Sequence, residues 1–125
     1  MLRIGDIHIT SGYKDRIIDE LRRVVADAGE ESVVFLGDYV YHFSYDRRAL
    51  LAFVDLLMEL QCEGRVVYVL AGNHDWLQGH FVYQEAQRVV ESLGGDSIHF
   101  ITEPVWKEID GEWILFLPYN YGLKR

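Results

Sequence analysis

The order of apolar and polar residues divides the chain into short apolar runs and longer amphipathic segments. Residues 32–36 and 66–71 are apolar without alternation, which is typical of strands buried on both faces. Residues 2–5 are predicted to form a further short strand. The longer segments repeat apolar residues at helical spacing; they are residues 13–28, 47–61 and 83–93. Strands and helices that alternate in this way predict an α/β fold with a parallel sheet.

Each helical segment is expected to bury an apolar face. In the first segment this face consists of Ile17, Ile18, Leu21, Val24, Val25 and Ala28. In the third segment it consists of Ala86, Val89, Val90 and Leu93. The second segment is heavily apolar, which indicates deep burial. Gly29 is predicted at the C′ position of the first helix, where a left-handed conformation is common, and Gly64 is predicted to close the second.

After Gly94 and Gly95 the pattern changes to strands. Residues 98–101 are predicted to form a short strand. Residues 105–118 contain two β-prone runs separated by Asp110 and Gly111, a pair that suits a type I′ hairpin turn. The parallel strands are therefore expected to be followed by an antiparallel pair.

Polar side chains follow each of the three apolar runs. Asp6 and His8 follow the first, Asp38 follows the second, and Asn73, His74 and Asp75 follow the third. In open α/β sheets, ligands bind at the carboxyl ends of the strands, so we expect the three clusters to converge on one site. Gly5, Gly37 and Gly72 precede the clusters and are expected to let the backbone turn sharply there.

The donor types in these clusters suit a divalent metal site. Carboxylate, imidazole and amide groups favour Mn²⁺, Fe²⁺ or Zn²⁺, and no thiolate is offered. Asp38, on the middle strand, is best placed to bridge two cations. Two metals about 3.5–4 Å apart would polarise a phosphoryl group and generate a hydroxide for in-line attack.

The motifs Asp6-x-His8, Gly37-Asp38 and Gly72-Asn73-His74-Asp75, in this order, resemble those of the calcineurin-like metallophosphoesterase superfamily. The spacing of the motifs, the helices between them and the strand from Phe116 to Tyr119 look closest to SbcD-type nucleases and related bacterial phosphoesterases. The resemblance implies a metallophosphoesterase-type α/β sandwich and two divalent ions, with Mn²⁺ favoured. It also implies that Asp6 and His8 hold the first metal, that Asp38 bridges, and that Asn73 holds the second. His74 would protonate the leaving group or stabilise the transition state, and Asp75 would orient it.

The resemblance covers only the N-terminal half of the family's domain, so the sandwich is expected to be incomplete and residues 1–125 to form a single domain. Family members continue to a further histidine and a Gly-His-x-His segment, which this sequence lacks. The first metal would have three ligands from this chain and the second only two, which predicts weak binding of the second. An apolar sheet face would also lack its cover, and we expect a homo-oligomer or a second subunit to cover it.

Taken singly, each motif is weak evidence for a metal site, because Gly-Asp is a common turn sequence and Asn or Asp often caps a helix. His42, His80 and His99 are expected on the surface or in loops, although His42 and His80 follow the second and third clusters. The aromatic residues Tyr39, Tyr41, Phe43 and Tyr45 are expected to pack within a loop rather than to line a pocket. Cys62 is expected to be a packed, inert thiol.

Composition narrows the class of protein further. The 125 residues carry 12 basic and 20 acidic side chains, a net charge of −8, which argues against nucleic-acid binding through a broad basic surface. It does not exclude a nucleic-acid substrate held through metal ions. A lone cysteine, no signal peptide and no membrane-spanning run predict a cytoplasmic protein.

Two functional hypotheses remain open. The first is a metal-dependent phosphoesterase that hydrolyses phosphate mono- or diesters, with a nuclease-like substrate. The second is a catalytically impaired phosphoesterase fold that acts as a protein-interaction module. A nucleotide-binding α/β domain is disfavoured, because no Gly-x-Gly-x-x-Gly or P-loop follows any predicted strand.

Overall fold

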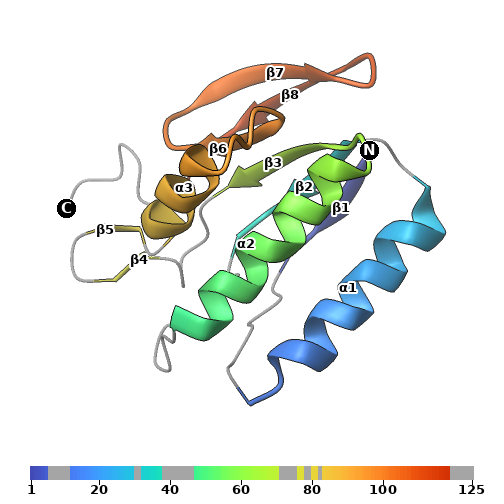
Figure 1. The fold of residues 1–125 in the computed structure, drawn as a ribbon. Helices are drawn as coiled ribbons and strands as arrows, with labels where there is room; N and C mark the ends of the chain where they lie inside the picture. The colour runs from blue at the N-terminus through green and yellow to red at the C-terminus, as the bar shows by residue number, and fades with distance from the viewer. Residues whose placement is uncertain are drawn as a thin grey trace.

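Parallel strands form the central sheet of the protein (Figure 1). The computed structural model describes residues 1–5, 12–29, 32–37, 47–70, 76–77, 80–81 and 83–118. The sheet has the order β1-β2-β3-β6, and each neighbouring pair is parallel. Its strands are β1 (Leu2–Ile4), β2 (Ser32–Phe35), β3 (Val66–Leu70) and β6 (Ile98–Ile101). The predicted strand bounds agree with these to within one residue.

Helices cover one face of this sheet. They are α1 (Lys14–Ala28), α2 (Arg47–Cys62) and α3 (Tyr83–Ser92), and α2 lies between the other two. Gly29 adopts a left-handed conformation with φ 65° at the end of α1, and its N–H donates to the carbonyl of Val25. The predicted helices are confirmed, and so is the predicted glycine stop.

The main core lies between the helices and the sheet. Side chains that alternate along the strands point into it, and Phe35 of β2 packs edge-on against Phe53 of α2 with ring centroids 5.2 Å apart. From α1, Ile18, Leu21 and Val25 are buried in this core. Val24, Ala28 and Leu93 are exposed, so their predicted burial was wrong. Val24 precedes the buried Val25 by one residue, a rotation of about 100° around the helix, which turns it away from the sheet.

A hairpin covers the other face of the sheet (Figure 1). Its strands are β7 (Val105–Ile109) and β8 (Glu112–Phe116), paired antiparallel through a two-residue turn. Asp110 and Gly111 have φ angles of 54° and 81°, both positive as a type I′ turn requires. The inner side chains of the hairpin form a second, smaller core with the sheet. The buried members of this core are Val34, Ile101, Ile109 and Phe116.

The hairpin turn is held to the sheet by polar contacts. The N-terminal ammonium of Met1 lies 2.9 Å from one carboxylate oxygen of Asp110. The hydroxyl of Ser32, at the start of β2, donates to the other oxygen at 3.2 Å. These contacts lower the pKa of Asp110, with the hydrogen bond from the N-terminus as the largest cause. They fix the register of the hairpin over the sheet.

The outer face of the same hairpin is apolar and exposed. Trp106 is 60% exposed and Trp113 64%, and they lie diagonally across the two strands because Trp106 pairs with Leu115 and Glu108 with Trp113. Leu115 and Leu117 extend the apolar surface and are 41% and 62% exposed. We call these four residues the Trp face. The sheet surface expected to be bare is therefore covered by the hairpin, and the exposed apolar surface lies one layer further out.

A second, short hairpin follows β3 and was not predicted. It pairs β4 (Trp76–Leu77) with β5 (His80–Phe81) in antiparallel fashion. Strands of two residues carry almost no periodic signal, which explains why the sequence pattern does not reveal them. Apart from this addition, the predicted α/β fold with mainly parallel strands and a C-terminal antiparallel hairpin is confirmed.

Candidate functional site

The carboxyl ends of β1, β2 and β3 lie side by side at one edge of the sheet. In the parallel register, Ile4 pairs with Phe35, and Phe35 pairs with Val69. The backbone N–H of Leu36 donates to the carbonyl of Ile4 at 2.7 Å, which continues the contact between β1 and β2 past the last paired residues. The three predicted clusters therefore follow strands that leave the sheet at the same edge.

All six predicted site residues lie outside the described residues. These are Asp6, His8, Asp38, Asn73, His74 and Asp75. Their starting points are nevertheless known from the register. Asp6 comes two residues after Ile4, Asp38 three after Phe35, and Asn73 four after Val69. Strand β2 lies between β1 and β3, so Asp38 follows the middle one of these three strands. A ligand that bridges two metals would need such a position between the other two donor groups.

The glycines that precede the clusters differ in their structural roles. Gly37 is buried and has φ 118°, a conformation that side chains rarely adopt, so it turns the backbone directly before Asp38. Gly5 has no positive φ, and a Cβ placed there would lie 3.5 Å from the Cβ of Leu36, an ordinary contact. The structure thus supports a glycine-specific turn at Gly37, whereas nothing in the described geometry of Gly5 requires a glycine. Gly72 lies outside the described residues.

The donor set fits a divalent metal at this edge. Two carboxylates, an imidazole and an amide oxygen follow three neighbouring strands, and these are the donors that borderline divalent ions take. Asp6 and His8 would hold a first ion, Asn73 a second, and Asp38 would contact both. Within the part of the chain that the structure describes, no group of three or more His, Cys, Asp or Glu residues could hold a metal.

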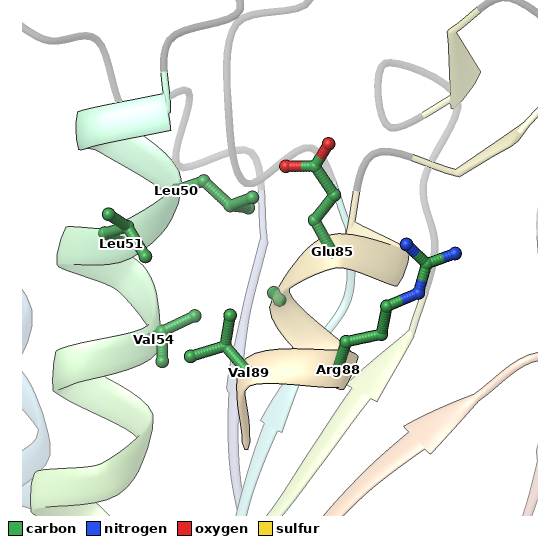
Figure 2. A pocket seen from close by; sticks show the side chains of 7 residues that line it. Leu50, Leu51, Val54, Glu85, Arg88 and Val89 are labelled. Carbon is green, nitrogen blue, oxygen red and sulfur yellow. The ribbon is translucent and has the colours of Figure 1, made fainter. Parts of the chain in front are cut away.

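A depression of about 170 Å³ lies near this edge, between the first turns of α2 and α3 (Figure 2). It is lined by Leu50, Leu51, Val54, Glu85, Ala86, Arg88 and Val89. Leu50, Val54 and Val89 lie in the gap between the two helices, whereas the carboxylate of Glu85 extends from its upper end. Most of the lining is aliphatic, and of its two charged residues, Glu85 and Arg88, only Arg88 offers a donor to a phosphate, so we do not assign the chemistry to this groove.

His99 occupies a position that the sequence pattern does not reveal. It lies half-buried in β6, and its ring stacks on Tyr68 of β3 with centroids 5.2 Å apart. Burial lowers the pKa of His99, and the charge of Lys107 lowers it further; burial also raises the pKa of Tyr68. The expected surface position of His99 was therefore wrong, because β6 turns this side chain under the hairpin. It is remote from the predicted ligands in sequence and belongs to the smaller core.

Other expectations about single residues have mixed outcomes. His80 lies in β5 rather than in a loop. Cys62 is exposed at the end of α2, so the prediction of a packed thiol was wrong. The reason is that α2 buries only the side turned to the sheet, and Cys62 falls beyond it. His42 and the aromatic residues Tyr39, Tyr41, Phe43 and Tyr45 lie outside the described residues.

The fold and the strand ends together define an α/β protein of the kind that gathers ligands at the carboxyl edge of a parallel sheet. Residues 2–122 match the family described as calcineurin-like phosphoesterase. Since this match spans almost the whole sequence, the chain belongs to that family. The resemblance inferred from the three motifs is confirmed.

Comparison with solved structures supports the same fold. The nuclease MPE from Pseudomonas putida superimposes with a TM-score of 0.56 at 20% sequence identity. The match covers 85% of this chain and 49% of the nuclease, so the chain spans about half the length of that protein. No curated protein matches the sequence. Among the described residues, no helix has the length and apolarity needed to span a bilayer.

Proposed function

We propose that this chain carries a divalent-metal site at the carboxyl edge of its sheet and hydrolyses phosphate mono- or diesters. One observation carries the proposal: three clusters of metal-type donors follow three adjacent parallel strands, in the order of the family's motifs. Residues 1–125 would form a single domain equivalent to the N-terminal half of the family's domain. A cytoplasmic location stays a prediction.

Each site residue has a proposed role. Asp6, His8, Asp38 and Asn73 would hold the divalent ions, with Asp38 as the ligand common to both. Bound divalent ions of this class polarise phosphoryl oxygens and supply a nucleophile at neutral pH. His74 donates a proton to the leaving oxygen, or stabilises the charge that develops there, and Asp75 holds the imidazole in the orientation that this transfer needs. Mn²⁺ is the preferred ion, and Fe²⁺ or Zn²⁺ are alternatives with the same donor preferences.

A nucleic acid is the substrate class that we favour. The similarity of the fold to a nuclease supports this choice. The net charge of −8 disfavours binding along an extended duplex by a broad basic surface, so recognition would rest on the phosphates held at the metal site. A short or single-stranded substrate fits this charge balance better than a long duplex.

The alternative is that the chain retains the fold as a protein-interaction module. One feature favours it: the hairpin exposes the apolar Trp face. The two hypotheses differ in a measurable way, because only the first requires both metal binding and hydrolysis.

Metal binding is tested first, without any assay of activity. Binding to the folded state stabilises it by about 2.7 kcal/mol when Mn²⁺ is at 100 times its dissociation constant, which raises the Tm by several degrees. We expect this shift in the wild type and its loss in Asp38→Asn. The control is Asp55→Asn, which changes an exposed carboxylate on α2 and should leave the shift intact. A wild type without a shift, or an Asp38→Asn variant with a full one, would contradict the assignment.

Hydrolysis is tested next, with bis(p-nitrophenyl) phosphate and a short single-stranded oligonucleotide. His74→Gln should keep the Mn²⁺-dependent rise in Tm and lose most of the rate, because its role lies in proton transfer. Loss of the Tm shift in this variant would show that His74 is instead a ligand. Metal binding without hydrolysis of either substrate in the wild type would favour the interaction module.

A further inference from the structure

We propose that the groove between α2 and α3 binds a nucleotide next to the scissile phosphate of a nucleic-acid strand. The base would lie between the aliphatic walls of the groove, and the phosphate of that nucleotide would bind Arg88. This role rests on the proposed function, because it places part of the same substrate beside the metal site. It adds a binding subsite built from residues that are neither metal ligands nor proton donors.

The groove lies at the end of the helix layer nearest the proposed metal site. Helix α2 begins nine residues after Asp38, and α3 begins eight residues after Asp75. Each helix connects two parallel strands, so its first turn lies at the carboxyl edge of the sheet. Leu50 and Glu85, which both line the groove, each lie within one turn of the start of their helix. A substrate strand held at this edge can therefore run beside the groove.

The walls of the groove suit the apolar faces of one base. Leu50, Val54 and Ala86 are at most 3% exposed and belong to the main core, so they form a fixed floor. Leu51 is 41% exposed and leaves apolar surface open at the edge of the groove. An apolar cavity of about 150 Å³ can hold a benzene molecule, so the volume of about 170 Å³ suits one ring-sized group. Apolar side chains commonly hold bases that have left the stack.

The rim of the groove carries charged groups that a nucleotide can use. Figure 2 shows the carboxylate of Glu85 and the guanidinium of Arg88 extending from α3 toward the end of the sheet to which the strand arrows point. Arg88 is exposed, and a guanidinium can donate two parallel hydrogen bonds to a phosphate. Glu85 offers an acceptor for the amino group of a base. Arginine and glutamate are almost never fully buried unless they are paired, so this rim favours a ligand over a packed part of a domain.

Binding in the absence of metal tests the groove by itself. A labelled, short, single-stranded DNA of mixed sequence is titrated with the protein in EDTA, and its fluorescence anisotropy is followed at several salt concentrations. Arg88→Gln should weaken binding roughly tenfold. It should also make the slope of log K against log salt shallower by about 0.7, as expected for one phosphate contact on a single strand. The matched control is Arg23→Gln, which removes the same charge from an exposed position on α1 and should keep the wild-type slope.

The apolar wall is tested by Leu51→Glu. This change places a carboxylate at the open edge of the groove and should weaken binding at least as much as Arg88→Gln does. Leu93→Glu makes the same change at an exposed leucine just after α3 and should bind like the wild type. Circular dichroism checks that both variants fold, and the conservative Arg88→Gln decides the question if Leu51→Glu does not.

Three results would overturn the assignment. Equal binding in Arg88→Gln and Arg23→Gln would show that only the net charge matters. Equal binding in Leu51→Glu and Leu93→Glu would show that the apolar wall is not used. A wild type that does not bind the DNA would show that the groove is covered or serves another purpose.

Turnover with Mn²⁺ separates this inference from the proposed hydrolysis. Arg88→Gln should cleave bis(p-nitrophenyl) phosphate at the wild-type rate, because this substrate has no neighbouring nucleotide, and should show a raised KM for the oligonucleotide. An unchanged KM for the oligonucleotide would overturn the groove and leave the hydrolysis standing. DNA binding that depends on Arg88, without cleavage of either substrate by the wild type, would support the groove and contradict the hydrolysis.

Discussion

The helices and the hairpin cover opposite faces of the sheet and stabilise it to different extents. On the helix face, side chains of α1, α2 and α3 bury a large core around Phe35, Phe53 and Val69. On the hairpin face the buried cluster is much smaller and depends on Ile109, Phe116 and their neighbours. Since hydrophobic stabilisation grows with the apolar area buried, most of it lies on the helix side. The hairpin side is fixed by a few packed residues and by polar contacts at its turn.

This comparison implies a division of roles. The helix face holds the strands in the order that brings their carboxyl ends together. The hairpin face is where the chain presents exposed apolar surface. Regions with few buried contacts open first in native proteins, so we expect the hairpin to be the less stable unit. The following predictions test whether the two faces differ as described.

The largest expected effect comes from truncating one phenylalanine in each core. Phe53→Ala removes a fully buried ring that packs against Phe35, and should lower the free energy of unfolding by about 3–5 kcal/mol. Phe116→Ala removes a ring that stacks on Tyr68 at 6.0 Å in the smaller core, and we expect a loss near the lower end of that range. Urea unfolding measures both values. A larger loss in Phe116→Ala would reverse the comparison.

Hydrogen exchange adds a second test of the same pair. Phe116→Ala should speed exchange in β7 and β8 while β2 stays protected, because the hairpin can open without the helix core. Phe53→Ala should speed exchange throughout the sheet. Uniform acceleration in both variants would mean that the two faces unfold as one unit.

A smaller effect is expected from the ion pair that joins α1 and α2. The guanidinium of Arg22 contacts both carboxylate oxygens of Glu59, at 2.7 and 2.8 Å, and also Asp19 at 2.6 Å. The hydrogen bond from Arg22 lowers the pKa of Glu59. Since the two side chains are 44% and 43% exposed, solvent screens the pair. Glu59→Gln should therefore cost only about 0.2–1 kcal/mol at low salt.

Salt provides the control for this pair. The cost of Glu59→Gln should shrink at about 1 M NaCl, where the Debye length falls to about 3 Å. The cost of Phe53→Ala should not shrink under the same conditions, because it reflects packing. Urea unfolding at both salt concentrations makes the comparison. An undiminished cost in Glu59→Gln would show that the residue acts through packing as well.

The smallest effect is expected from His99 and depends on pH. Burial lowers the pKa of His99 below its ordinary value of 6.5, so in this range the unfolded chain binds the proton more readily than the folded one. The free energy of unfolding should thus decrease as the pH falls below about 6.5 toward the folded-state pKa. His99→Gln should show a weaker dependence between pH 8 and pH 5.5. An equal dependence in both proteins would assign the effect to other histidines.

The same argument predicts acid-sensitive contacts on both sides of the sheet. Asp110 has a lowered pKa in the folded state, so its contribution is present above the ordinary value of 3.8 and is lost as the pH falls below it. His99 begins to destabilise the folded state at a higher pH than the one at which the Asp110 contacts are lost. Acid should therefore weaken the hairpin layer in two steps, whereas among the described groups of the helix layer only Glu59, whose pKa the hydrogen bond from Arg22 lowers, adds an acid-sensitive step.

The sequence by itself determined most of the secondary structure and the family. The repeat of apolar residues and the length of each segment distinguish helices such as residues 14–28 from buried strands such as residues 32–35. They can do so because the spacing of apolar residues reflects which side of an element is buried. The Asp110-Gly111 turn could be predicted because positive φ angles select these residue types. The three motifs were recognisable because ligand side chains at strand ends are local in sequence. They correctly indicated the calcineurin-like phosphoesterase family.

Only the tertiary structure decided which faces of these elements are covered. Periodicity assigns Val24 and Leu93 to apolar stripes, but the angle at which each helix lies on the sheet leaves both exposed. His99 carries a polar side chain in an apolar run, and only the hairpin packed over β6 makes it half-buried. The order β1-β2-β3, which places the segment of Asp38 between those of Asp6 and Asn73, is likewise a property of long-range pairing. Contacts between residues far apart in sequence set burial and strand order, and local patterns do not encode them.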